Sequence, residues 1–523
     1  MENYLKNIKI LFSATILLLI MGIIIGISVL KDSNLFTAQH ISQVIDYLHY
    51  KSSFTYTNDK NLTASVISIF ANTSPSIKGN DVAKSIPVLL YHGIINEPDG
   101  SNILLKNFKE QMFALKKAGW QTVSIEDFYK FMKGEKELPD KSFLLTFDDG
   151  RKDSYYTTDP LLRSLSYTAV MFIDTEHSIT LGGNKYYLSP QELRVMLKSK
   201  RWEIQSHGRM AHSLYPISSE GAMGTFLGNK LWLHDKESIE TDEEFRLRIE
   251  ADIAGSKDDI HQAFGVDVNG FAYPFGDFGH ISKNYPEAEN VVLDTVKSVY
   301  PMSFYQVWPR KGFSFNYPEG EQFLVKRIGV RPYWSSDNLL KVLDTAKEKN
   351  LPYIDNFSNY NGWLINDGKL SIENTSMILG SNSSTGSSVF LDGSYLWKNY
   401  IFKSNIRLLK GKSFSLLSRY KDSDNHVSCQ FTPEYIRIEY AKEGNKTLVQ
   451  EKKGKFVFIG RNREVGMGVN DNVVDCYIDG EVALKSDGVI KIPNHGGVGF
   501  ETWDPEVNNS DIVIKEISVE EIK

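Results

Sequence analysis

The spacing of hydrophobic and polar residues after residue 85 changes near residue 351. In residues 86–352, short apolar runs alternate with segments whose apolar residues recur every three or four positions, which is typical of buried parallel strands and amphipathic helices. Strands are predicted at 86–94, 142–147, 169–173, 202–206, 270–273 and 324–330, and helices at 107–119, 155–165, 189–199, 241–264 and 336–349. This alternation predicts a barrel-like α/β domain.

After residue 351 the pattern becomes one of short strands with alternating polar and apolar positions. Asp-Gly turns separate or flank several of them. The strands are predicted at 400–408, 413–420, 427–431, 435–440, 473–478 and 512–519. Residues 353–523 therefore predict an all-β domain, most simply a sandwich.

The most hydrophobic stretch lies near the N-terminus. Residues 10–30 carry no charge and are long enough to cross a bilayer as a helix, and lysines flank them on both sides. We expect an uncleaved signal anchor, with residues 1–9 in the cytoplasm, because basic residues on a short N-terminal side stay inside. Residues 31–85, rich in Ser, Asn, Thr and Lys, predict a stalk. The remaining chain is then expected outside the cell, held at the membrane by one span.

Composition narrows the function classes. The chain of 523 residues has a formal net charge of only -6, and no basic stripe or dinucleotide fingerprint is present, so we expect no nucleic-acid partner. Its two cysteines, Cys429 and Cys476, both lie in the predicted β domain. An extracellular location permits a disulfide between them, and two buried thiols are the alternative.

The chemistry is expected at the end of the strand at 142–147. The sequence there reads SFLLTFDDG, an apolar run that stops at Asp148 and Asp149. The C-terminal ends of barrel strands are where α/β enzymes place their catalytic groups. Adjacent residues point to opposite sides, so the two carboxylates can take different roles. Taken alone, Asp-Asp-Gly is equally typical of a turn or a helix N-cap.

Two histidines support the catalytic interpretation. IQSHGRMAHSL places His207 and His212 five residues apart, directly after the strand at 202–206. Two imidazoles and the carboxylate of Asp149 suit zinc and leave a coordination position for water, as in hydrolytic sites. Asp148 beside them is then the general base. Taken singly, each histidine is more often an ordinary core or surface residue, and only the joint pattern is specific.

Four motifs, YHG at 91–93, TFDDG at 146–150, SHGRMAH at 206–212 and YPFG at 273–276, resemble those of the NodB-type polysaccharide deacetylases. The resemblance covers about 86–351 and implies a distorted (β/α) barrel. The histidine spacing is similar to that of the branch acting on poly-N-acetylglucosamine.

By motif, the resemblance implies that Asp148 is the general base and that Asp149, His207 and His212 hold one divalent metal ion, zinc first, with cobalt or nickel as alternatives. The backbone N–H of Phe275 would then help to stabilise the oxyanion.

Two family features are missing from this sequence. Ala272 stands where many relatives carry an arginine that orients the base, and the segment 324–334 lacks the late histidine that acts as general acid. His92 and His280 are the candidates for that proton donor.

Further residues are expected to contact substrate. These are Tyr91, His92, Tyr273 and Trp308, and Phe313 and Tyr333 are aromatic candidates for lining a sugar cleft, although aromatic residues more often belong to a core.

The C-terminal region resembles the concanavalin-like sandwich modules attached to many carbohydrate-active proteins. Its segments 354–370, 473–486 and 496–504 carry this resemblance. Sugar binding and a purely structural spacer are both open interpretations. Trp363, Trp397 and Trp503 are the aromatic candidates for stacking on sugar rings.

The sequence thus predicts a membrane-anchored, metal-dependent deacetylase of an extracellular N-acetylglucosamine polysaccharide of the biofilm type. Peptidoglycan or an O-acetylated polysaccharide is the alternative substrate. A carbohydrate-binding scaffold with weak catalysis is an alternative of another class. A polysaccharide synthase complex is an expected partner by analogy only.

Overall fold

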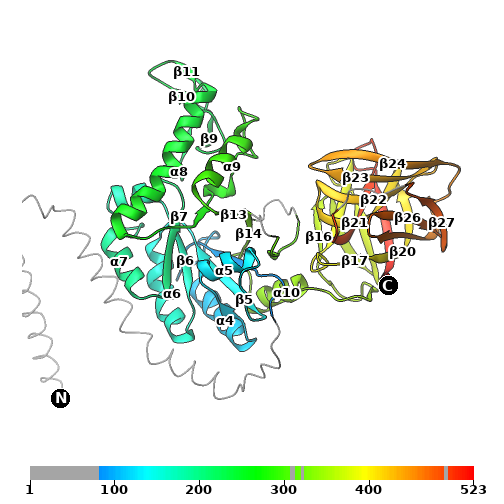
Figure 1. The fold of residues 1–523 in the computed structure, drawn as a ribbon, viewed down its shortest axis with the longest axis horizontal. Helices are drawn as coiled ribbons and strands as arrows, with labels where there is room; N and C mark the ends of the chain where they lie inside the picture. The colour runs from blue at the N-terminus through cyan, green and yellow to red at the C-terminus, as the bar shows by residue number, and fades with distance from the viewer. Residues whose placement is uncertain (1–81, 307–311, 320–322, 488–492, 523) are drawn as a thin grey trace, which may run out of the picture.

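The computed structural model describes residues 82–306, 312–319, 323–487 and 493–522 (Figure 1). The predicted membrane segment 10–30 and nearly all of the predicted stalk lie outside these ranges. Within them, no helix is both long enough and apolar enough to span a membrane.

Seven parallel strands close into a barrel in the N-terminal half. They run in the order β1-β14-β13-β12-β7-β6-β5, and β1 pairs with β5 to close the ring. The strands are β1 (Val88–Tyr91), β5 (Ser142–Phe147), β6 (Ala169–Ile173), β7 (Trp202–Ser206), β12 (Gly270–Ala272), β13 (Met302–Gln306) and β14 (Leu324–Gly329). The short β4 (Gln121–Thr122) adds to the start of β5. The predicted barrel is confirmed, with seven strands.

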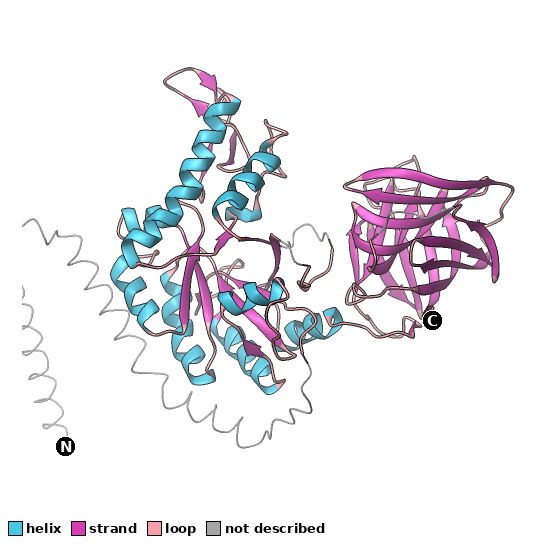
Figure 2. Cartoon of the chain, viewed as in Figure 1, coloured by secondary structure: helices cyan, strands magenta, loops and turns pink. Residues whose placement is uncertain are grey.

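Helices surround the barrel (Figures 1 and 2). They are α4 (Leu105–Lys117), α5 (Ile125–Met132), α6 (Lys152–Leu165), α7 (Pro190–Lys198), α8 (Asp242–Phe264), α9 (Ala288–Val299) and α10 (Ser336–Ala346). Capping boxes begin α7 and α8, because Ser189 and Thr241 each exchange hydrogen bonds with the glutamate three residues on. The sequence pattern had not indicated α5, α9 or β13.

Alternate strand residues form two separate cores. One set, including Val88, Leu144 and Phe304, fills the barrel interior together with Phe128 of α5. The other set, including Phe147, packs outward against the helices. Because both faces are buried, these strands read as continuous apolar runs.

Short strands outside the barrel sheet form two-stranded sheets. They are β2 (Ile94–Ile95) with β3 (Ile103–Leu104), β8 (Leu214–Pro216) with β9 (Met223–Thr225), and β10 (Trp232–Leu233) with β11 (Ser238–Ile239). The last two pairs lie in the long connection between β7 and α8, which also carries both predicted histidine ligands, His207 and His212.

The C-terminal part consists of two antiparallel sheets (Figure 2). The first contains β17 (Lys369–Glu373), β18 (Ser376–Gly380), β29 (Asp511–Glu521), β20 (Tyr400–Lys410), β25 (Asn462–Asn470), β26 (Val473–Ile478) and β27 (Glu481–Lys485), with β15 (Tyr353–Asp355) beside β29. The second contains β16 (Trp363–Asp367), β19 (Gly386–Leu391), β28 (Gly497–Trp503), β21 (Ser413–Asp422), β22 (Asn425–Phe431), β23 (Tyr435–Lys442) and β24 (Asn445–Lys453). The prediction of an all-β region is confirmed.

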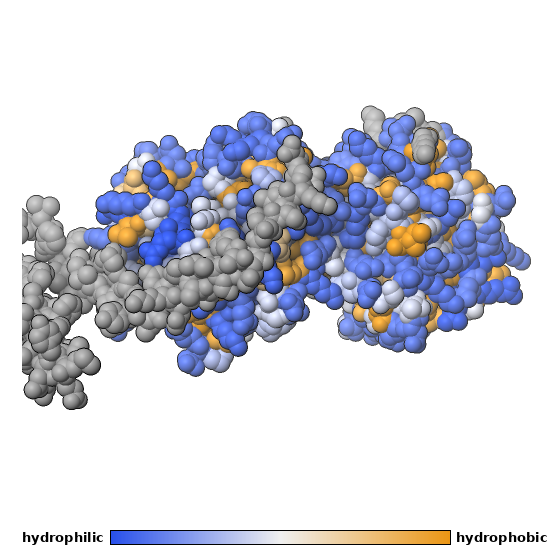
Figure 3. All heavy atoms as spheres, turned by 90° about the horizontal axis from the view of Figure 1, so that it is seen from below, coloured by the Kyte–Doolittle hydropathy of each residue, from blue (hydrophilic) through white to orange (hydrophobic). Residues whose placement is uncertain are grey.

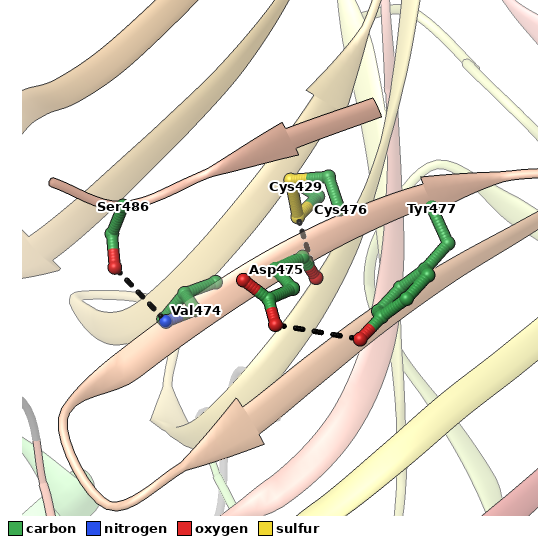
Figure 4. The surroundings of a disulfide bond; sticks show 6 residues. All are labelled: Cys429, Val474, Asp475, Cys476, Tyr477 and Ser486. Atoms are coloured by element: carbon green, nitrogen blue, oxygen red, sulfur yellow. Dashed lines mark hydrogen bonds between the residues drawn. A yellow bond between two sulfur atoms is a disulfide. The ribbon is translucent and has the colours of Figure 1, made fainter. Parts of the chain in front are cut away.

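One hydrophobic core joins these two sheets. Phe402 of β20 in the first sheet packs on Phe500 of β28 in the second, with ring centroids 5.1 Å apart. Cys429 of β22 and Cys476 of β26 form a disulfide from one sheet to the other (Figure 4). Of the two alternatives for the cysteines, the structure therefore has the bonded pair.

The barrel and the β region also touch each other directly. Phe313, in the segment between β13 and β14, packs against Phe390 and Tyr395 with ring centroids 5.3 and 4.9 Å away. Glu319 accepts a hydrogen bond from Lys421 of β21 (2.6 Å). Phe313 is only 1% exposed, so it serves this contact and not the predicted sugar cleft. On the face seen in Figure 3, hydrophobic side chains form only small groups on a mainly hydrophilic surface.

Candidate metal centre and active site

The acidic tip of β5 lies at the carboxyl end of the barrel, as predicted. Asp148 has the same parity as Leu144, which points into the barrel interior, and its carboxylate is 1% exposed. Both carboxylate oxygens of Asp148 accept hydrogen bonds from Arg327 of β14, at 2.6 and 2.8 Å. Arg327 itself is fully buried, with its guanidinium over the ring of Phe172. This bidentate pair fixes the orientation of the carboxylate.

Asp149 turns its side chain away from that pair. Its backbone φ of 71° is left-handed, a conformation that costs free energy for a residue with a Cβ and that often marks a functional site. The carboxylate oxygen Oδ1 lies 3.0 Å from Nε2 of His212 and 3.6 Å from Nε2 of His207. The two adjacent carboxylates therefore face different partners.

A short loop after β7 brings the two histidines together. Asp252 of α8 accepts hydrogen bonds from the backbone N–H groups of Arg209 (3.2 Å) and Met210 (2.6 Å). The Arg209 side chain pairs with Asp259 of the same helix at 2.7 Å. Helix α8 thus fixes the conformation of this loop, and the loop brings His207 and His212 close to each other despite their separation of five residues.

Gly208 is required within this loop. Its φ is +84°, and a Cβ there would lie 3.0 Å from both Ala211 Cβ and Asp252 Oδ2. The glycine lets the loop pass close to α8.

These residues fit a divalent metal ion. The ligand atoms of Asp149, His207 and His212 lie within 4.8 Å of one another. Nδ1 of His207 lies 2.8 Å from the carbonyl oxygen of Ala272 and donates to it, which leaves the lone pair of Nε2 facing the carboxylate. Oδ1 of Asp149 is buried and faces Nε2 of both imidazoles. A cation between these lone pairs would satisfy all three groups, and two imidazoles with one carboxylate match a hydrolytic site.

Phe275 lies beside this cluster, in the one-turn helix η2 (Pro274–Gly276) after β12. Its ring stacks on His212, with centroids 5.1 Å apart and planes 10° from parallel. Its φ of 60° is again left-handed. Because it stands in the first turn of a short helix, its backbone N–H has no intrahelical acceptor.

Electrostatics keep both carboxylates ionised. Burial by itself would raise the pKa of Asp148, but the charge of Arg327 outweighs burial and the pKa is lowered. Burial would also raise the pKa of Asp149, yet its contacts with His207 and His212 hold this pKa well below the usual value. The pKa of His212 is raised, because Asp149 outweighs the opposite effect of burial. Burial lowers the pKa of His92, which sits within the field of both aspartates.

The residues predicted to contact substrate differ in their exposure to solvent. Tyr91 and Tyr273 are 1% and 0% exposed, so their side chains belong to the core and burial argues against direct contact with substrate. The hydroxyl of Tyr91 donates to Gln111 instead (2.9 Å). Trp308 lies outside the described residues, and Tyr333 is 77% exposed.

Between the two proton-donor candidates, the structure favours His92. His92 directly follows β1, whose Tyr91 pairs with Phe147, so it lies beside the acidic tip of β5. His280 stacks on Phe278 and lies 3.7 Å from Asp277.

Arg327 is the residue that sequence reasoning missed. The arginine expected before Pro-Phe-Gly is absent, since Ala272 stands there, but β14 supplies one from a different strand. The signal was an arginine in the buried segment LVKRIGV, with the same parity as Val325 in the barrel interior. A buried charge in a barrel strand requires a partner at the same level.

Comparison with known proteins agrees with this geometry. Residues 135–290 match the family model described as polysaccharide deacetylase. The poly-beta-1,6-N-acetyl-D-glucosamine N-deacetylase of Escherichia coli K12 is 26% identical over 208 residues, which are 38% of this chain and 30% of that protein. The protein of the same name from Staphylococcus aureus N315 is 28% identical over 111 residues, 20% of this chain and 37% of the relative.

The chain thus spans about a third of the length of these curated relatives. Among solved structures, a de-N-acetylase from Aggregatibacter actinomycetemcomitans is 19% identical, with a TM-score of 0.43 over 49% of this chain and 98% of that one. The family match falls within the barrel and includes the Asp-Asp tip and both histidines. Residues 135–290 of the barrel therefore form part of a polysaccharide deacetylase domain.

Proposed function

We propose that this protein hydrolyses N-acetyl groups of an extracellular polysaccharide that contains N-acetylglucosamine, of the biofilm exopolysaccharide type. The observation that carries the proposal is the Asp149, His207 and His212 cluster next to a carboxylate held by Arg327. The names of the curated relatives support the choice of polymer.

Each residue has a chemical role in this proposal. Asp148, kept ionised and oriented by Arg327, accepts a proton from the attacking water. Asp149, His207 and His212 would hold one divalent ion, for which we propose zinc. Such an ion supplies Lewis acidity at the acetyl carbonyl.

The remaining steps concern the oxyanion and the leaving amine. The backbone N–H of Phe275, beside His212, donates a hydrogen bond to the developing oxyanion. His92 gives the proton to the leaving amine, because it directly follows β1, whose Tyr91 pairs with Phe147 next to the acidic tip.

Arg327 weakens the alternative of a catalytically inactive scaffold. That alternative depended partly on the arginine missing at Ala272, and β14 supplies an equivalent guanidinium to the base. We further propose that residues 10–30 anchor the chain in the cell membrane with the barrel outside, and that a polysaccharide synthase complex delivers the polymer.

The test uses amine release from β-1,6-linked N-acetylglucosamine oligomers, with and without a chelator. His212→Ala is expected to lose bound zinc, measured by metal analysis of the purified protein. Asp148→Asn is expected to keep zinc but to lower kcat by about 10²- to 10⁴-fold, the range of general base catalysis. His234→Ala, which removes an exposed histidine, is the control and should match wild type.

Two results would contradict the proposal. Zinc retained by His212→Ala at wild-type affinity would refute the ligand set. Amine release that persists at the wild-type rate after chelation would refute a metal-dependent reaction.

A further inference from the structure

A polar groove crosses the outer face of the second sheet of the C-terminal region, away from the barrel site. It forms a pocket of about 250 Å³ on strands β21, β22, β23, β24 and β28. The groove is lined by Ser413, Ser415, Gln430, Tyr435, Arg437, Glu439, Lys446, Glu501, Thr502 and Trp503.

Strand alternation explains which residues line the groove. On β21, Phe414 and Leu416 point into the core, so Ser413 and Ser415 face outward. Ser415 pairs in register with Glu501 on one side and Gln430 on the other, and Gln430 pairs with Arg437. Small serines in the middle and long side chains at the edges leave a hollow between them.

An ion pair across the groove indicates that the sheet is concave here. Lys446 of β24 lies 3.7 Å from Glu501 of β28, although β21, β22 and β23 lie between these two strands. A flat sheet would separate β24 from β28 by four strand spacings, ~19 Å, which is more than the two side chains can span. The pair is partly exposed, so it contributes little stability and separates readily.

The side chains of the groove match a sugar. Trp503 is 43% exposed at the edge of the groove, whereas Trp363 and Trp397 are buried at 0% and 5%. An indole ring packs against the apolar face of a pyranose and removes apolar surface from water. Gln430 and Glu439 provide the hydrogen-bonding groups that sugar hydroxyl groups require.

Charge narrows the class of ligand. Both cations of the groove already lie beside carboxylates, Arg437 beside Glu451 (2.6 Å) and Lys446 beside Glu501 (3.7 Å). Glu439 adds a further carboxylate. An anionic polymer would therefore be repelled, whereas a neutral or cationic one is accepted.

We propose that this groove binds a segment of neutral or partly deacetylated hexosamine polysaccharide, with one sugar ring stacked on Trp503. The inference concerns a second site, and it depends on the proposed function only for the identity of the polymer. A polymer held at this groove would stay bound to the chain while acetyl groups are removed at the barrel.

The test is calorimetric titration of the full chain, purified in mild detergent, with chelator present to prevent turnover. The probes are a β-1,6-linked N-acetylglucosamine hexamer, its fully deacetylated form and a hyaluronate hexamer. Trp503→Ala is expected to weaken binding of the first two at least tenfold, and Trp503→Tyr to retain most of the affinity. Glu439→Gln should weaken the deacetylated hexamer more than the acetylated one. Hyaluronate should not bind.

Val482→Ala on β27 removes a similarly exposed side chain from the other sheet and serves as the matched control. Equal affinities of Trp503→Ala and Val482→Ala for both hexosamine hexamers would refute the proposed binding site. Tight binding of hyaluronate would also refute it. If the chain releases acetyl groups but both variants bind the hexamers equally, the result refutes only the proposal that the groove binds polysaccharide. A chain that needs Trp503 for binding but releases no acetyl group refutes the deacetylase proposal alone.

Discussion

At the scale of single residues, the site depends on charged groups that are buried in pairs. Asp148 and Arg327 are 1% and 0% exposed and share two short hydrogen bonds. Removing water from both charges is costly, and the cost is offset only while each keeps the other. The pair therefore fixes the orientation of the proposed base, and its loss should also destabilise the barrel.

Arg327→Met should destabilise the protein because it leaves Asp148 charged and buried without its partner. We expect a loss of ~3–5 kcal/mol in the free energy of unfolding, measured by urea denaturation. Arg461→Met removes an exposed arginine and is the control, with an effect within ~0.5 kcal/mol. Adding Asp148→Asn to Arg327→Met should restore part of the loss, and no restoration would contradict the paired-charge explanation.

Gly208→Ala tests the loop that joins the two histidines. The new Cβ would meet Ala211 and Asp252 at 3.0 Å, so we expect zinc to bind about tenfold more weakly as the loop shifts. Gly480→Ala is a matched control, because Gly480 has the same φ of +84° but nothing within 4 Å of its Cβ position. Zinc affinities measured by competition with a chelating dye should differ between the two variants, and equal affinities would show that crowding at Gly208 does not matter.

At the scale of elements, the C-terminal sheets are held by a shared core and by one covalent link. The disulfide joins β22 of one sheet to β26 of the other, 47 residues apart in sequence. Such a link restricts the unfolded chain more strongly than the folded one. Because the core and the disulfide lie between the two sheets, the outer face of the second sheet can consist of polar side chains, including those of the groove.

Cys429→Ala with Cys476→Ala should lower the stability of the β region. Loop-closure entropy for a separation of 47 residues predicts a loss of about 4 kcal/mol, and measured losses are commonly somewhat smaller. Thermal unfolding followed by circular dichroism provides the measurement. Dithiothreitol should lower the Tm of wild type toward that of the variant and leave the variant unchanged, and a reductant-insensitive wild type would contradict the role of the bond.

At the scale of the whole molecule, the barrel and the β region are joined through residues 312–319. Phe313 packs among the rings of the second sheet, and Glu319 accepts hydrogen bonds from Lys421 and His495 at 2.6 and 2.9 Å. The barrel and the β region therefore share an interface that combines apolar and charged contacts.

Protonation of Glu319 at low pH should weaken this interface. Burial would raise the pKa of Glu319, but His495 and Lys421 outweigh it and lower the pKa from 4.5 to about 2. A lowered carboxyl pKa contributes stability that is fully present above about pH 4.5 and is lost as the pH falls toward 2. Because the side chain is 35% exposed, we expect only ~1 kcal/mol.

Glu319→Gln removes this titration and isolates it from the other carboxylates. The difference in the free energy of unfolding between wild type and variant should be ~1 kcal/mol at pH 6 and should vanish near pH 2. Glu516→Gln, at an exposed glutamate of β29, should show no such pH-dependent difference. A difference that is constant across this pH range would contradict the predicted linkage.

The hydrophobic pattern by itself determined many of the elements and the broad architecture. Strands β6, β7 and β26 lie at the predicted residues, and the capping boxes of α7 and α8 form, because period, caps and turn residues are local properties. The Asp-Asp tip and the two histidines were also recognisable, since each directly follows a buried strand. Short elements such as α5 lacked enough turns for a pattern to emerge.

Only the tertiary structure decided which distant residues meet. Arg327 reaches Asp148 from 179 positions away, because closure of the barrel brings β14 and β5 to either side of β1. The choice among three tryptophans was likewise decided by burial, which left Trp503 exposed and placed Trp363 and Trp397 in the interior. Local sequence encodes period and propensity, whereas partners across a closed sheet depend on how the strands are ordered in space.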